Sequence, residues 1–132
     1  MDTPEQRVET TLPAARTSVR DARRFIDRTL RAWSVPSEPR DTACLLTTEL
    51  VTNAVLHAGS PVGLALKGWD HRLRVEVSDR SDTIPTLRAA HTAVGTTGRG
   101  LTLVKGFSHK WGVTPHPPGK SVWFELEVGD PS

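Results

Sequence analysis

The sequence predicts a two-layer α/β sandwich of the α+β kind, in which helices cover one face of a mainly antiparallel sheet. Three observations lead to this prediction. Two long stretches carry apolar residues at helical spacing, several short stretches alternate apolar and polar residues as strands in hairpins do, and parallel crossovers are too few for a doubly wound fold. The chain has 132 residues. This is the length of one domain spanning residues 1–132, which is enough to bury roughly 68% of the unfolded surface.

Two helices are predicted in the first half of the chain. Apolar side chains recur in steps of three and four within residues 14–33, which is typical of an amphipathic helix. Ser37 is expected to cap the second helix, residues 38–57. This second helix is apolar almost all round, so we expect it to be buried on more than one side. Residues 58–61, Ala-Gly-Ser-Pro, end it.

Alternation of apolar and polar residues predicts the strands. Asp70 and His71 are expected to form a tight hairpin turn, and residues 98–107 a short helix opened by glycines. Residues 80–97 form a long irregular stretch, and such stretches inside compact domains are usually functional or disordered. The predicted strands are residues 7–12, 62–67, 73–78, 111–114 and 121–128.

Composition excludes several classes of protein. Hydrophobic residues make up 36% and charged residues 24% of the chain, as in an ordinary globular domain, and the formal net charge is only +2. The dense arginines of residues 16–31 are therefore interpreted as a solvated helix face in preference to a nucleic-acid patch. The single Cys44 excludes an intrachain disulfide and a cysteine-based zinc site. No apolar run approaches a membrane span or a signal peptide, which predicts a cytoplasmic protein.

A polar stripe interrupts the second predicted helix. Glu49, Asn53 and His57 follow at spacings of four, so they lie along one side of an otherwise apolar helix. A buried carboxylate without a partner costs several kcal/mol, so something must satisfy the stripe. One interpretation is a hard cation such as Mg²⁺ with its anionic ligand. The other is a polar seam satisfied within the protein.

Two further features suggest ligand chemistry. Asp79 continues the inward-facing positions of residues 73–77, so it points a carboxylate toward the core where the strand ends, and it could accept a hydrogen bond from the amino group of adenine. The alternative is an aspartate that caps the following loop. Glycines in residues 95–101 could let backbone N–H groups approach an anion at a helix start, or could serve as a hinge. They match neither a Walker A loop nor a dinucleotide fingerprint.

Taken in order, these pieces resemble the GHKL ATPase superfamily, which includes gyrase, Hsp90, MutL and sensor histidine kinases, and within it the short anti-sigma-factor serine/threonine kinases. Glu49-x-x-x-Asn53-Ala54-x-x-His57 resembles the N box, and Asp79 the acid of the first glycine box. The remaining matches are Gly98-Arg99-Gly100-Leu101, which resembles the second glycine box, and Gly119-Lys120-Ser121-Val122-Trp123-Phe124, which resembles the terminal Gly-Thr segment that closes over the adenine side.

The resemblance implies a Bergerat-type ATP-binding fold with a mixed sheet, and ATP and Mg²⁺ as cofactors. It implies that Glu49 is the general base, that Asn53 is the Mg²⁺ ligand and that Asp79 reads adenine. It makes residues 80–97 the ATP lid. The other nucleotide-binding residues that it implies are His57, the phosphate cradle of Gly98, Arg99, Gly100 and Leu101, and Ser121.

The resemblance also implies a regulatory ATP-dependent phosphotransferase that acts on transcription. Such a protein binds a sigma factor and phosphorylates an antagonist protein, without direct contact to nucleic acid or membrane, and the sequence is compatible with a homodimer.

The first glycine box departs from the pattern of the superfamily. The first glycine box of the superfamily is Asp-x-Gly-x-Gly, whereas residues 79–83 are Asp-Arg-Ser-Asp-Thr and Pro85 follows. Backbone approach to the nucleotide should be poorer, so we expect slow turnover. The alternative function is a catalytically weak or inactive binding module that sequesters a regulatory partner.

Overall fold

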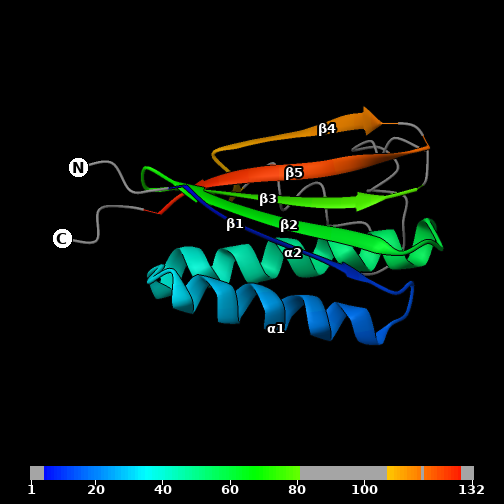
Figure 1. Cartoon of the computed structure of the whole chain (residues 1–132), viewed down its shortest axis with the longest axis horizontal. Coiled ribbons are helices and arrows are strands. Elements are labelled where there is room, and N and C mark those ends of the chain that lie inside the picture. Colours follow the sequence, from blue (N-terminus) through cyan, green and yellow to red (C-terminus); the bar gives the residue numbers. More distant parts are fainter. Residues whose placement is uncertain (1–4, 81–106, 117, 129–132) are drawn as a thin grey trace.

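A computed structural model describes residues 5–80, 107–116 and 118–128 of the chain. It has five strands, in the order β1-β2-β3-β5-β4 across one sheet, and all four pairings between neighbouring strands are antiparallel (Figure 1). The elements are β1 (Gln6–Leu12), α1 (Thr17–Ala32), α2 (Ser37–His57), β2 (Val62–Trp69), β3 (Arg72–Asp79), β4 (Lys110–His116) and β5 (Gly119–Glu127).

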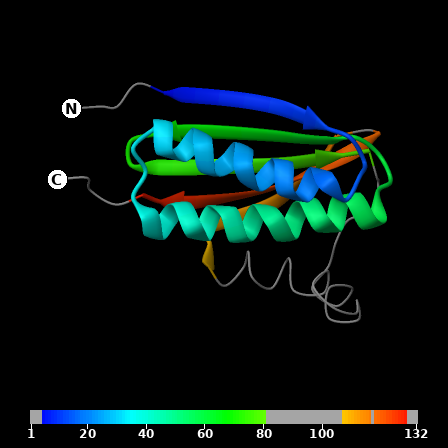
Figure 2. The same cartoon turned by 90° about the horizontal axis from the view of Figure 1, so that it is seen from below.

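Both helices lie on the same face of the sheet and run side by side along the strands (Figures 1 and 2). α1 contacts the edge strand β1, whereas α2 packs mainly on β3 and β5. Inward-facing apolar side chains fill the space between the layers, with Phe124, Ile26, Leu30 and Leu46 among the largest that are fully buried. The predicted two-layer sandwich is confirmed. The predicted edge strand in residues 7–12 is confirmed as β1.

α1 ends in a Schellman motif. The N–H of Val35 donates to the carbonyl of Leu30 and the N–H of Ser34 to that of Arg31, at 2.9 and 3.0 Å. Ser34 adopts a left-handed backbone with φ of 59°. The next helix begins at Ser37, after Pro36, with no side-chain capping hydrogen bond. The prediction that Ser37 caps this helix was wrong, because Pro36 occupies the N-cap position and Ser37 is already helical. The carbonyl of Pro36 accepts the N–H of Arg40, and the fixed φ of proline suits the start of a helix.

α2 buries a broad part of its circumference, including the fully buried Ala43, Leu46 and Val51. The prediction of burial on more than one side holds only in part, since Leu45 is 44% and Leu56 is 51% exposed.

The thiol of Cys44 belongs to the core, and burial raises its pKa, with a further contribution from Asp27. No helix of the described residues is long and apolar enough to cross a membrane.

The hairpin turn between β2 and β3 lies where it was predicted. Asp70 and His71 both have positive φ, 41° and 63°, as a two-residue hairpin turn that matches the strand twist requires. The predicted helix at residues 98–107 and the predicted lid at residues 80–97 lie outside the described residues, apart from Arg80 and Phe107.

β5 begins two residues earlier than the alternation predicted, at Gly119. The strand continues to this point because Gly119 approaches the end of β3 very closely: a Cβ atom there would collide with the backbone oxygen of Asp79. The longer strand brings Lys120 into register directly opposite Asp79. This pairing determines the composition of the candidate site.

Candidate functional site

The polar stripe of α2 is only partly buried. Glu49 is 6% exposed, and Asn53 follows one turn later with intermediate burial. The side-chain oxygen of Asn53 is fully buried and has no hydrogen-bond partner among the described residues. His57 is the last residue of the helix and is exposed, unlike Glu49 and the side-chain oxygen of Asn53.

Asp79 is the last residue of β3 and its side chain faces the helices. Buried and half-buried residues alternate along β3, and Asp79 follows Leu73, Val75 and Val77 on the buried side, as the sequence predicted. It is 8% exposed. The backbone N–H of Arg80, which follows Asp79, donates to the hydroxyl of Ser60 at 3.0 Å.

Lys120 lies beside Asp79 on the same face of the sheet. Its ammonium group donates to both carboxylate oxygens, at 2.9 and 3.1 Å, and Lys120 is only 7% exposed. Sequence reasoning missed this residue. The signal was available, because Lys120 keeps the alternation with the buried Val122 and Phe124, but a lysine at the start of a strand is normally expected in solvent.

Ser121 lies on the other face of the sheet. Its hydroxyl hydrogen-bonds with that of Ser78 at 2.7 Å, across the same pair of strands. Successive side chains of a strand point to opposite faces, so Ser121 and its neighbour Lys120 point to opposite faces. The structure therefore brings Lys120, and not Ser121, next to Asp79.

The proposed phosphate cradle of Gly98, Arg99, Gly100 and Leu101 lies outside the described residues. Within the described ranges, no group of three or more His, Cys, Asp or Glu residues could hold a metal ion. The described part of the site therefore consists of Glu49 and Asn53 from α2 and the Asp79–Lys120 pair from the strand ends. All four belong to the side of the sheet where the helices pack.

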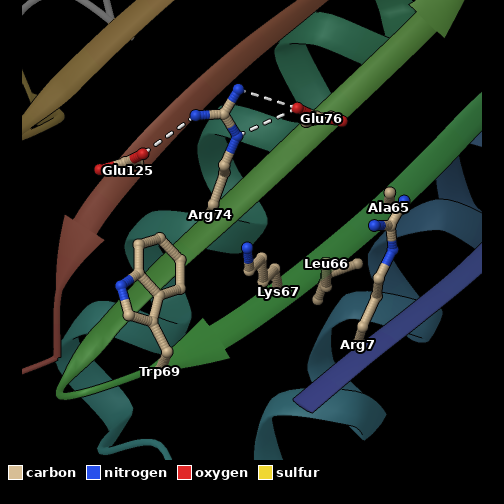
Figure 3. A pocket seen from close by; sticks show the side chains of 8 residues that line it. All are labelled: Arg7, Ala65, Leu66, Lys67, Trp69, Arg74, Glu76 and Glu125. Carbon is tan, nitrogen blue, oxygen red and sulfur yellow. Dashed lines mark hydrogen bonds and ion pairs between the residues drawn. The ribbon is translucent and has the colours of Figure 1, made fainter. Parts of the chain in front are cut away.

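A separate pocket lies on the open face of the sheet (Figure 3). It has a volume of about 310 Å³, and its charged lining residues are Arg7, Lys67, Arg74, Glu76 and Glu125. Arg74 binds Glu76 at 2.9 Å and Glu125 at 3.0 Å, and its guanidinium lies 4.1 Å from the centre of the Trp123 ring. None of the predicted site residues lines this pocket.

Comparison with known proteins gives a family. Residues 12–126 match the model of the histidine kinase-like ATPase domain, which covers most of the chain. The sequence has no significant match among curated proteins.

Solved structures share the fold. A structure of the RsbU and RsbW domains of Rv1364c from Mycobacterium tuberculosis superposes with a TM-score of 0.72 and 17% identity, covering 98% of this chain and 34% of that one. The chain thus spans about a third of that protein's length. The SiaB–SiaC complex from Pseudomonas aeruginosa gives a TM-score of 0.56 and 12% identity, covering 90% of this chain and 88% of that one. At these identities the likeness concerns the fold, and the family match identifies the chain as a member of the histidine kinase-like ATPase domain family.

Proposed function

We propose that this protein is an ATP-binding regulatory kinase of the anti-sigma-factor type, which phosphorylates a serine or threonine of an antagonist protein and binds a sigma factor. The observation that carries the proposal is the buried side-chain oxygen of Asn53, which has no hydrogen-bond partner in the described part of the structure and follows one turn after the buried Glu49. An amide oxygen left in this way costs free energy unless a ligand satisfies it.

The donor set of α2 fits a Mg²⁺ ion shared with a nucleotide. Mg²⁺ is usually held by one or two side-chain oxygens together with water and substrate phosphates, and Asn53 offers such an oxygen. Bound Mg²⁺ would neutralise charge on the phosphates. Glu49 would act as the general base that accepts the hydroxyl proton of the partner's serine.

The remaining roles are proposed from the resemblance of the sequence motifs. Asp79 would accept a hydrogen bond from the amino group of adenine, the backbone N–H groups of residues 98–101 would bind the phosphates, and residues 80–97 would form the lid. ATP supplies the transferred phosphoryl group, and the cytoplasm would be the site of action.

The partner is proposed from the structural neighbours. One neighbour contains an RsbW domain beside an RsbU domain, and the other was solved as a complex of two proteins. Both are compatible with a small ATPase domain whose role is to act on a second protein. For this chain, an antagonist protein would be the phosphorylated substrate and a sigma factor the sequestered ligand.

Transfer of labelled phosphate from ATP to candidate antagonist proteins tests the proposal. Glu49→Gln should lower turnover by about 10²–10⁴-fold while Mg²⁺-ATP affinity, measured by calorimetry, changes little, because a positioned base contributes mainly to the transition state. Glu38→Gln is the matched control, since Glu38 lies in the exposed first turn of the same helix. Equal labelling by the parent and the Glu49 variant would contradict the assigned base.

A binding module is the second candidate. The Asp79–Lys120 ion pair favours it, because the acid that would read adenine already has a partner. The missing glycines of the first glycine box favour it as well. This function predicts stable binding of a sigma factor or another regulator without Mg²⁺-ATP, and no phosphate transfer that depends on Glu49.

A further inference from the structure

The ion pair between Asp79 and Lys120 is unusual for its burial. Among the described residues, Lys120 is the one buried lysine or arginine, with its side chain 9% exposed and that of Asp79 6% exposed. The two residues are direct cross-strand neighbours, and the close approach of Gly119 to Asp79 leaves little freedom to shift the register. The ammonium is therefore held against the carboxylate by the sheet itself.

Electrostatics favour keeping the Lys120 ammonium paired with the Asp79 carboxylate. An ammonium ion loses several kcal/mol of hydration on burial, and here the opposite carboxylate offsets this loss. Hydrogen bonds between ionised partners are stronger than those from a neutral donor to the same acceptor. The amino group of a purine is a neutral donor, so its hydrogen bond to Asp79 would be weakened where the Lys120 ammonium already compensates the charge of both carboxylate oxygens.

We infer that Lys120 competes with the nucleotide base for Asp79. This competition lowers the affinity for ATP and weakens the hydrogen bond between Asp79 and the 6-amino group of adenine. This inference rests on the proposed nucleotide site and names a specificity-determining residue within it. Removing the ammonium should make the carboxylate available to the base. Affinity for ATP should then rise, and the 6-amino group should contribute more to binding.

Calorimetric titration with Mg²⁺-ATP and with Mg²⁺-purine riboside triphosphate, which lacks the 6-amino group, tests this. The parent should bind ATP no more than about fivefold tighter than the purine analogue. Lys120→Met should bind ATP about tenfold tighter than the parent, and its preference for ATP over the analogue should exceed about tenfold, the range of a hydrogen bond to a charged acceptor. Lys110→Met removes the same charge from an exposed position of β4 and should leave both affinities unchanged.

The outcomes separate this inference from the proposed function. If neither nucleotide binds the parent or the variants, the nucleotide site itself is wrong. If ATP binds the parent but Lys120→Met binds it equally or more weakly, the competition is wrong and Lys120 supports the nucleotide. The parent alone also decides the matter if the variant does not fold, because a preference for ATP above about fivefold would show that Asp79 reads the amine unhindered.

Discussion

The cost of changing a buried ion pair depends on whether one partner or both are removed. Asp79→Asn leaves the Lys120 ammonium buried without the carboxylate opposite it, so we expect the free energy of unfolding to fall by about 3–5 kcal/mol. The double variant Asp79→Asn/Lys120→Met removes both charges and should recover a large part of that loss. Urea unfolding of the parent, both single variants and the double variant measures the coupling.

The control is an exposed pair on the same sheet. Arg7 and Glu9 lie 3.6 Å apart with side chains 57% and 65% exposed, so Glu9→Gln should change stability little. If the double variant were as unstable as the sum of the two single variants, the two charges would act independently and the pair would not be energetically coupled.

Some site residues could be predicted from the sequence and others could not. The inward position of Asp79 follows from strict alternation along β3, and the side-by-side placement of Glu49 and Asn53 follows from their spacing of four on a helix. Alternation with Val122 and Phe124 indicated the inner face for Lys120, but its burial depends on a partner from another strand. Local sequence places a lysine in water, and only the tertiary pairing with Asp79 reverses this.

The elements were predictable where local patterns dominate. The two helices and the β2–β3 hairpin agree with their predicted positions because apolar spacing and turn residues determine them. Their ends were less predictable, since α1 begins three residues later than expected and β5 two residues earlier. The start of β5 depends on how closely Gly119 can approach Asp79, a contact between segments that are far apart in the sequence.

The left-handed residue at the end of α1 offers a test at this scale. Ser34 has φ of 59°, where an L-residue with a side chain is strained and glycine is not. Ser34→Gly should therefore raise the free energy of unfolding by about 0.5–1 kcal/mol, visible as a higher Tm. Ser34→Ala keeps the strain and should give no gain, while Ser37→Gly, in the first turn of α2, should be neutral or destabilising. A stabilising Ser37→Gly with an unchanged Ser34→Gly would contradict this account of the α1 terminus.

At the scale of the whole molecule, the candidate site joins the two layers. Glu49 and Asn53 come from the helical layer, and Asp79 and Lys120 come from strand ends of the sheet. A ligand that contacts both sets binds the folded protein and not the unfolded chain. Mg²⁺-ATP at a hundred times its Kd should therefore stabilise the fold by about 2.7 kcal/mol. The empty site should cost stability at one position, because the buried side-chain oxygen of Asn53 has no hydrogen-bond partner among the described residues.

Asn53 allows both effects to be measured in one variant. Its buried side-chain oxygen has no hydrogen-bond partner among the described residues, so Asn53→Leu should raise the stability of the nucleotide-free protein by about 1 kcal/mol. The same change should remove the Mg²⁺-dependent part of the stabilisation by ATP.

Thr47→Val is the matched control, since the Thr47 hydroxyl is also buried on α2 without a hydrogen-bond partner in the described structure, but it does not belong to the stripe. Thr47→Val should therefore gain stability and keep the full response to Mg²⁺-ATP in thermal unfolding. If Asn53→Leu kept that response as well, the unsatisfied oxygen would be a packing defect of α2 and not a ligand for the ion.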